Sequence, residues 1–358
     1  VGAAAGSMAG VVECRRPVKE LRLTLILAIV AGLAQWCPGR SCRSPSPAPD
    51  GMKGSMRVNS VFRGLRRLAC LLCIAGVAVA ALPASAGAAE PPQRVVAIGG
   101  AITEIAYALG QQDRLVGVDA TSSFPPRAAE KPNVGYMRAL SAEGVLALRP
   151  DLILAVEGSG PPGAVDILKS ASIPFVMVPD GRTLEGIDRK IERVAVAFGV
   201  PEAGRDLAAR VHDDLAAVLA KTGAVTARKR ILFVMTGTDG RPMGAGQDTA
   251  ADAIIRLAGA ENALQGVSGY KPVSPEAIAA TAPDVVLAMR RSDGVELDPD
   301  QLFATPALKF TPAARDRALI VMDGLYLLGF GPRTAWAVRD LAGRLYPDLD
   351  LPRGHASR

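Results

Sequence analysis

A repeat between the two halves of this chain constrains its fold more than any other feature. The segment GYMRALSAEGVLALRPDLILA occupies residues 135–155, and GYKPVSPEAIAATAPDVVLA occupies residues 269–288. Glu143 and Glu276 are 133 positions apart, and an aspartate eight residues further on in each copy keeps the same separation. A repeat of this length predicts two similar lobes that face each other across a cleft, with matched elements in matched places.

Around the repeat, short β-branched runs alternate with helical patterns, which is typical of parallel sheets covered by helices. The expected strands are 94–98, 114–118, 151–156, 174–178, 230–235, 284–289 and 318–322. The expected helices are 103–110, 141–148, 163–171, 184–198, 201–222, 248–259, 274–281 and 332–346. We therefore expect an α/β fold of two Rossmann-like lobes with parallel-type sheets, joined by one long helix, with a ligand cleft between the lobes. The first lobe would comprise residues 89–200, the linking helix 201–227 and the second lobe 228–350.

Residues 56–88 have the pattern of a secretory signal peptide. A basic stretch is followed by an uncharged apolar run of 15 residues at 68–82, and small residues suited to cleavage end the segment near Ala86. Such a run is short for a membrane span, which needs about 20 residues. A lipoprotein anchor is the alternative, but Cys70 and Cys73 lie at the start of the apolar run, whereas a lipidated cysteine should end it. We expect a cleaved signal and export to the periplasm.

The segment 1–55 has no periodicity, and we expect it to be a non-native or disordered extension. The positive charge also lies in the leader: residues 1–88 hold 11 Lys and Arg against 3 Asp and Glu, whereas residues 89–358 hold 30 against 32. The net charge of +6 therefore does not belong to the predicted lobes. For this reason we expect no nucleic-acid partner.

The predicted lobes contain no cysteine and almost no histidine, the residues that many catalytic sites need. All five cysteines precede residue 74, so the predicted lobes have none for a disulfide framework, a zinc ribbon or a nucleophile. His212 and His355 are the only histidines; the first falls within a predicted helix and the second in a polar tail, and we interpret both as structural or solvated. A serine hydrolase would need a histidine base. We therefore expect a binding protein rather than an enzyme.

Loops at the carboxyl ends of the strands face the cleft in sheets of this kind, and ligands bind there. The candidate loops are 99–103, 133–138, 236–246, 267–272 and 324–331. Although they are rich in glycine, none has a dinucleotide fingerprint or a phosphate loop with its lysine. Most of these glycines are therefore interpreted as tight turns that lead into helices.

Tyr136 and Arg138 form the most informative pair in these loops. Phenolate is a known haem ligand; a ferric centre stabilises it directly, and a guanidinium two residues away favours the charged form. Arg138, Arg241 and Lys271 are available for the carboxylates of a large, flat, apolar ligand. In the alternative interpretation, Tyr136 packs its ring at a lobe edge and Arg138 is solvated.

Glu143 and Glu276 each follow a serine, Ser141 or Ser274, that is placed to cap a helix. Acidic residues favour a helix N-terminus because of the helix dipole, and that explanation needs no function. One exposed carboxylate in each lobe would also suit two arginines on a two-fold symmetric partner. Both interpretations can hold together.

The chain resembles the periplasmic substrate-binding proteins of iron-compound and vitamin B12 ABC importers, and among them it is most similar to the haem (hemin) binders. The resemblance covers residues 92–347 and rests on RVVAIGGAITEIAYALG, NVGYMRALSAEGVLALRPDLILA, GRPMGAGQDTAADAIIRLAGAENA and GYKPVSPEAIAATAPDVVLA. It implies a protein that receives haem in the periplasm and delivers it to an inner-membrane ABC permease with its ATPase. An outer-membrane haem receptor system would be an indirect partner.

The resemblance also implies roles for individual residues. Tyr136 matches the axial ligand of the iron, Arg138 the arginine that supports it, and Tyr270 a position on the opposite cleft wall. Glu143 and Glu276 match the acidic residues that dock onto the permease. The residues expected at the haem are Tyr136, Arg138, Arg241, Met243, Tyr270 and Lys271. Some relatives hold two stacked haems with a histidine from the second lobe; the absence of histidine from the second-lobe loops favours one haem, or a second held without histidine.

Two other functions remain open from the residues alone. A ferric-siderophore or corrinoid binder would share the fold, and would need basic clusters or an aromatic cage; Trp336 is the only tryptophan after the leader. An exported enzyme on the same fold, such as a metal chelatase or a hydrolase, is disfavoured by the scarcity of histidine and cysteine.

Overall fold

The computed structural model describes residues 90–236, 242–290 and 297–353. Every described residue belongs to one compact unit, Gly87–Arg358. The expected extension, the expected signal peptide and Arg241 of the predicted site lie outside the described residues. The expected limits of the lobes and of the linking segment remain predictions.

The first sheet has four strands in the order β2-β1-β3-β4, and all neighbours are parallel. The strands are β1 (Val95–Ile98), β2 (Leu115–Val118), β3 (Leu152–Val156) and β4 (Phe175–Val178). Every residue of β1 and β3 is buried, because both strands are central and covered on both faces. Val95 and Ala97 belong to one hydrophobic cluster, and Val96 and Ile98 belong to another, so apolar side chains cover each face. We call the part built on this sheet the first lobe.

The helices of the first lobe begin and end at recognisable local signals. They are α3 (Gly100–Ala108), α4 (Ala142–Ala147), α5 (Pro162–Ser170) and α6 (Leu184–Phe198), with 3-10 helices at Gln112–Arg114 and Pro126–Glu130. Thr183 caps α6 by accepting a hydrogen bond from the backbone N–H of Gly186 at 3.1 Å. Gly199 ends α6 in the left-handed region, with φ at 76°, where a side chain would be strained. The predicted helix 184–198 is confirmed at both ends.

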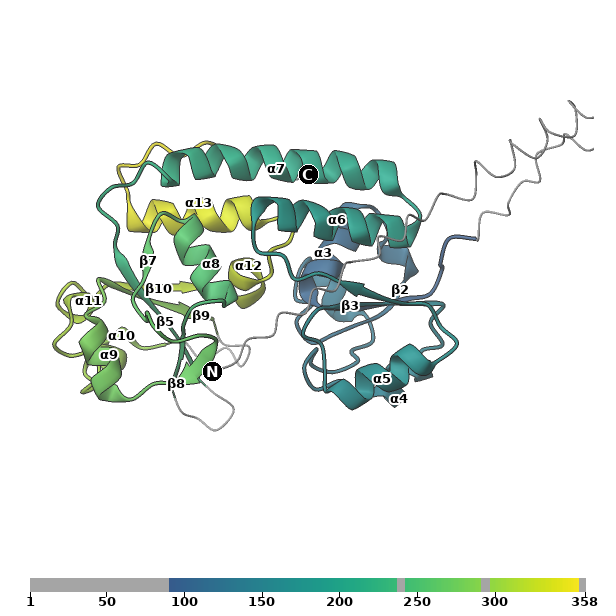
Figure 1. The fold of residues 1–358 in the computed structure, drawn as a ribbon, viewed down its shortest axis with the longest axis horizontal. Helices are drawn as coiled ribbons and strands as arrows, with labels where there is room; N and C mark the ends of the chain where they lie inside the picture. Colours follow the sequence, from purple (N-terminus) through teal and green to yellow (C-terminus); the bar gives the residue numbers. More distant parts are fainter. Residues whose placement is uncertain (1–89, 237–241, 291–296, 354–358) are drawn as a thin grey trace, which may run out of the picture. The chain divides into compact units, whose positions relative to one another are not determined.

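One long helix, α7 (Pro201–Thr222), follows the first lobe and leads to the second. Its 22 residues span about 33 Å, and Pro201 occupies the first turn, where a backbone N–H is not needed. Helix α7 packs alongside both α6 and α13 (Thr334–Leu345), as Figure 1 shows. At Gly204 the backbones approach so closely that an added Cβ would lie 2.2 Å from the Cβ of Ala195 in α6. Only glycine fits at this crossing.

The second sheet is mixed. Its order is β10-β9-β5-β6-β8, with β7 also paired to β5. The strands are β5 (Arg230–Thr236), β6 (Pro242–Ala245), β7 (Glu261–Asn262), β8 (Tyr270–Pro272), β9 (Val285–Met289) and β10 (Leu319–Met322). Strands β10, β9 and β5 are parallel, whereas β6 runs antiparallel to β5 and β8 antiparallel to β6. We call the part built on this sheet the second lobe.

Strands β6 and β8 differ from the sequence prediction, which assigned residues 236–246 and 267–272 to cleft loops. The prediction also expected parallel pairing in both sheets, whereas these two strands pair antiparallel. Proline and glycine are depleted in strands, and β6 contains Pro242 and Gly244, so its sequence did not predict a strand. Only five residues separate β5 from β6. Consecutive strands joined this closely must pair antiparallel, because a parallel crossover needs a dozen residues or more.

The second lobe contains α8 (Ala250–Leu257), α9 (Pro275–Thr281), α10 (Pro299–Phe303), α11 (Pro312–Arg315), α12 (Gly324–Leu328) and α13. Helix α12 corrects the prediction of a cleft loop at 324–331. Asp323 caps it by accepting a hydrogen bond from the backbone N–H of Tyr326 at 2.9 Å. Leu325 then packs against α3, where a Cβ added to Gly100 would lie 2.6 Å from the leucine Cδ1. The segment therefore packs against the first lobe.

The repeat in the sequence corresponds to a repeat of local structure. Ser141 caps α4 and Ser274 caps α9, each accepting a hydrogen bond from the backbone N–H three residues on, at 3.1 and 3.2 Å. Asp151 accepts a hydrogen bond from the backbone N–H that precedes β1 (2.9 Å), and Asp284 accepts one from the first residue of β5 (2.8 Å). Each aspartate thus joins the start of its own strand to the neighbouring strand of the sheet. Along the described ranges, no helix is long and apolar enough to span a membrane.

Candidate ligand-binding site

Tyr136 is held on a short turn between β2 and α4. Gly135, with φ at 94°, adopts a backbone conformation that favours glycine, and its N–H donates to the side-chain oxygen of Asn133 at 2.7 Å. The carbonyl of Gly135 accepts a hydrogen bond from the backbone N–H of Ala120 at 2.8 Å. The turn is therefore fixed to the first lobe on its N-terminal side. The Tyr136 side chain is nevertheless 47% exposed.

The two residues that follow Tyr136 differ in their exposure. Met137 is half-buried against hydrophobic clusters of the first lobe, and its carbonyl accepts a hydrogen bond from the backbone N–H of Gly160 at 2.9 Å. Arg138 is exposed, as Tyr136 is. The turn thus uses one apolar side chain as an anchor and leaves a phenol and a guanidinium accessible to a ligand.

Tyr270 begins β8 in the second lobe and is half-buried. Its ring meets Phe233 of β5 edge to face, with centroids 6.4 Å apart and planes at 66°. Burial raises the pKa of the Tyr270 phenol, although a hydrogen bond from the Ala251 backbone and the positive charge of Arg138 oppose the rise. The charge of Arg138, on the first-lobe turn, therefore acts on the Tyr270 phenol of the second lobe. The placement of the two tyrosines on opposing walls of a ligand cleft stays a prediction.

The pairing of β6 with β8 places Met243 and Lys271, two further predicted site residues, on opposite faces of the sheet. Met243 lies opposite Pro272, and Ala245 lies opposite Tyr270, so these four side chains share one face of the β6–β8 pair. Lys271 lies opposite Gly244 on the other face and is exposed. A Cβ added to Gly244 would contact Leu264, which marks this second face as the one toward a different hydrophobic cluster. The arrangement brings Met243 together with Tyr270 and does not bring Lys271 to them.

The sequence did not identify a charged cluster that Asp180 and Arg182, in the loop between β4 and α6, form with Lys190 of α6. Arg182 donates to a carboxylate oxygen of Asp180 at 2.6 Å, and Lys190 donates to the other at 3.3 Å. Lys190 is fully buried on the apolar face of α6, between Ile187 and Ile191. Burial lowers the pKa of its ammonium, and the charge of Asp180 opposes that effect. A lysine within an apolar helical stripe was the available signal, because such a residue needs buried partners.

The two candidate docking residues are both exposed in the first turn of a helix. Glu143 lies in α4 and Glu276 in α9. Hydrogen bonds from its own backbone N–H and from Ser274 hold the pKa of Glu276 below its usual range. Both glutamates suit the helix dipole, and both remain accessible to a partner.

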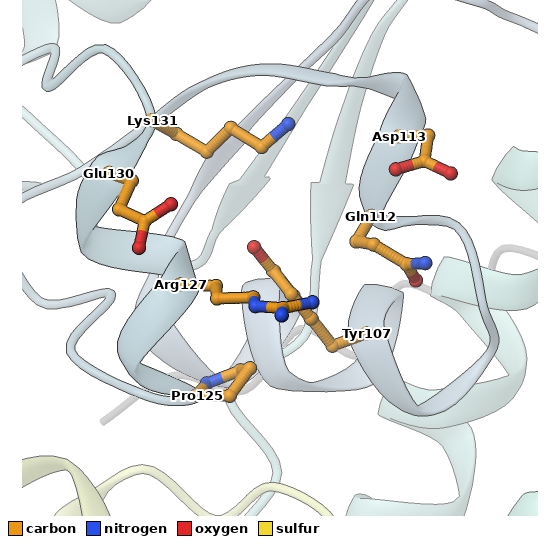
Figure 2. Close-up of a pocket in the computed structure, with 7 residues that line it drawn as sticks. All are labelled: Tyr107, Gln112, Asp113, Pro125, Arg127, Glu130 and Lys131. Carbon is orange, nitrogen blue, oxygen red and sulfur yellow. The ribbon is translucent and has the colours of Figure 1, made fainter.

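Two of the hollows in the described surface bear on the search for a site. The larger, of about 640 Å³, contains none of the predicted site residues, and Figure 2 shows the side chains of Tyr107 and Arg127 pointing into it. Its other lining residues are Gln112, Asp113, Pro125, Glu130 and Lys131. The smaller, of about 450 Å³, lies between the start of α6 and helix α8, and both Arg182 and Asp248 line it. The described ranges hold no group of three or more His, Cys, Asp or Glu residues suited to a resident metal ion.

The comparisons with known proteins agree with this two-lobed architecture. The profile of a family described as periplasmic binding protein matches residues 95–325. A solved structure, the periplasmic heme-binding protein BhuT in complex with two hemes, is 44% identical, with a TM-score of 0.65 and coverage of 70% of this chain and 97% of that chain.

Two curated relatives match this chain over most of their own length. The vitamin B12-binding protein of Pectobacterium atrosepticum is 29% identical over 77% of this chain and 92% of that protein. An uncharacterized ABC transporter substrate-binding lipoprotein of Bacillus subtilis, YvrC, is 27% identical over 72% of this chain and 82% of that protein.

Proposed function

This chain belongs to the periplasmic binding protein family, and we propose that it captures haem between its two lobes and delivers it to an ABC permease with its ATPase. It has a substrate-binding role for an ABC importer. The observation that carries the choice of haem is the exposed Tyr136 phenol on a fixed turn, with Arg138 two residues away and Tyr270 within the electrostatic reach of that arginine.

Each proposed role follows from the chemistry of the side chain. Tyr136 would ligate the ferric iron as a phenolate, a ligand type that haem iron accepts, and the Arg138 guanidinium would favour the charged phenolate. Met243 would supply a polarisable apolar contact on the face that also carries Tyr270. Arg138 and Arg241 are assigned to the haem carboxylates ahead of Lys271, which occupies the opposite strand face.

The haem assignment is supported by the degree of likeness. The structure named as a heme-binding protein is 44% identical over nearly its whole length, whereas the relative named for vitamin B12 is 29% identical. The BhuT structure holds two hemes. The lack of histidine between Val225 and Leu351 leaves this chain without an imidazole for a second haem in the second lobe, and one haem is the proposed stoichiometry.

The setting of the protein completes the proposal. The compared proteins are named as a periplasmic binding protein and a substrate-binding lipoprotein, and the segment 56–88 would export this chain to the periplasm. Glu143 and Glu276 would dock onto the permease, one from each lobe. The compared proteins are named as binding proteins, and we propose no catalytic activity.

The test is an absorbance titration of residues 87–358 with hemin. A saturable shift of the Soret band that ends at one equivalent is expected, and a parallel titration with cyanocobalamin should produce no saturable change. Tyr136→Phe should change the spectrum of the bound haem, whereas Tyr107→Phe, at the separate hollow of Figure 2, should leave it unchanged. Saturable binding of cyanocobalamin without binding of hemin would replace haem by a corrinoid as the ligand.

A further inference from the structure

We propose that Arg182 is a positioning residue: its hydrogen bonds hold the second-lobe segment that carries Tyr270 against the first lobe. The proposal rests on the proposed function, because it concerns how the same cleft is held in shape. Arg182 lies in the loop between β4 and α6, and one of its Nη atoms donates to the backbone carbonyl of Asp248 at 3.0 Å. Its other Nη atom donates to Asp180 at 2.6 Å. One guanidinium thus joins a loop of the first lobe to the segment that precedes α8 in the second.

The first-lobe end of this link is firmly anchored. Asp180 also accepts a hydrogen bond from the fully buried Lys190 at 3.3 Å. The same ammonium donates to the carbonyls of Gly329 and Phe330 at 3.4 and 3.2 Å. An ammonium has three protons, and these three acceptors use all of them. Because a buried charge without partners is costly, Lys190 has little freedom to move, and Asp180 is held with it.

The second-lobe end of the link leads directly to Tyr270. Asp248 has a left-handed backbone, with φ at 62°, and its carboxylate accepts a hydrogen bond from the Ser268 hydroxyl at 3.1 Å. Its neighbour Gln247 exchanges backbone hydrogen bonds with the same segment: its carbonyl accepts from the N–H of Gly269 at 2.9 Å. Ser268 and Gly269 immediately precede Tyr270 in the chain. A displacement of Asp248 would therefore move the start of β8.

The chemistry of the link requires arginine. A guanidinium is planar and holds five N–H donors in fixed directions, so it can bridge a carboxylate and a carbonyl at once. A lysine is a single charged point at the end of a flexible chain and would not hold both partners in one geometry. The charges of the link also act on the pKa of the Tyr270 phenol, which Arg182 lowers and Asp180 raises.

A double-mutant cycle in residues 87–358 tests the proposal. Arg182→Ala and Tyr270→Phe should each weaken hemin binding by about tenfold, and the double variant should bind no more weakly than Tyr270→Phe alone, since coupled residues are non-additive. Arg182→Lys should lose nearly as much affinity as Arg182→Ala. Arg193→Ala, an exposed arginine on α6, is the matched control and should leave affinity unchanged. Additive losses in the double variant, or unchanged affinity in Arg182→Ala, would overturn the positioning role.

A second measurement needs no haem and separates this proposal from the proposed function. Amide hydrogen exchange of the ligand-free protein should accelerate between residues 246 and 270 in Arg182→Ala, because the hydrogen bonds of Gln247 and Gly269 lose their support. Arg193→Ala should exchange as the unaltered protein does. If Arg182→Ala does not fold, Arg182→Lys serves in its place. Unchanged exchange in a folded Arg182 variant would overturn the proposal, even if the unaltered protein binds hemin as expected.

Discussion

Glu104 of α3 forms a buried ion pair with Arg333, the residue that precedes α13. The Arg333 Nε donates to Glu104 Oε2 at 3.2 Å, and the two side chains are only 15% and 5% exposed. The guanidinium also stacks on Phe124, with its central carbon 3.6 Å from the ring centroid. Burial raises the pKa of Glu104, although its bond to Arg333 opposes the rise. Helix α13 of the second lobe is thus joined at its start to the core of the first lobe.

Removing one partner of this pair should leave a buried charge without compensation. We expect Arg333→Met to lower the free energy of unfolding by about 3–5 kcal/mol near neutral pH. Without Arg333 the pKa of Glu104 would rise further above its unfolded value, so the native state would bind the extra proton and stability would recover as the pH falls. Urea unfolding near pH 7.5 and near pH 5 measures both effects. In Glu104→Gln/Arg333→Met the pH dependence should be lost; if it persists, another group is responsible.

Loss of the Tyr136 hydroxyl should affect the bound haem without affecting the stability of the protein. Tyr136→Phe should remove the charge-transfer absorption of a ferric phenolate while the free energy of unfolding changes by less than about 0.5 kcal/mol, because the side chain is exposed. The absorption spectrum of the hemin complex and a thermal melt measure the two quantities. A variant that keeps the unaltered spectrum would show that Tyr136 is not the ligand.

The close crossing of α6 and α7 predicts a specific steric effect. Gly204→Ala should lower the free energy of unfolding by about 1–3 kcal/mol, because the added methyl group would overlap the Cβ of Ala195. Gly163 in α5 has open space around its Cβ position, so Gly163→Ala is the matched control and should be neutral or stabilising by up to about 1 kcal/mol. Equal effects of the two substitutions would contradict the crossing.

His212 should titrate above its ordinary value. Its Nδ1 lies 2.7 Å from Asp188 Oδ2, and this hydrogen bond raises the pKa of the imidazole. The stabilisation is therefore fully present below about pH 6.5, the unfolded value, and is lost as the pH rises through the higher folded pKa. Proton NMR of the imidazole measures the midpoint directly. Asp188→Asn should lower it toward the ordinary value, and an unchanged midpoint would contradict the pairing.

The docking role of the two glutamates can be tested apart from ligand binding. Glu143→Arg and Glu276→Arg should each reduce permease-dependent haem uptake, because they would repel arginines on the permease. Hemin titration of the same variants should be unchanged. Asp206→Arg, an exposed charge reversal on α7, should affect neither quantity. Normal uptake in a double Glu143→Arg/Glu276→Arg variant would leave the helix dipole as the sole explanation of these residues.

Much of the fold could be predicted because its central elements are locally self-consistent. The strands β1, β3 and β9 are continuous apolar runs, and α6 and α7 have both their periodicity and their terminal signals in the sequence. Strands β6 and β8 and helix α12 could not be predicted, because they contain glycine or proline and depend on tertiary pairing.

The site divides in a similar way. Side-chain chemistry predicts a role for Tyr136, whereas the role of Tyr270 is implied by the family resemblance alone. The structure places Tyr136 on an exposed turn and Tyr270 at the start of β8. The face of β8 that each residue occupies could not be assigned without its pairing to β6, which places Lys271 on the face opposite to Tyr270. Asp180 and Arg182 were missed because their partners are distant in sequence: Lys190 is 10 residues away from Asp180 and Asp248 is 66 residues away from Arg182.

The antiparallel strands β6 and β8 lie at one end of a sheet whose other neighbours are parallel. Substitutions in these two strands can therefore change the chemistry of a cleft wall while the pairing of β5, β9 and β10 is kept. A residue exchanged at this margin of the sheet would therefore leave the hydrogen-bonded register of the central parallel strands as it is.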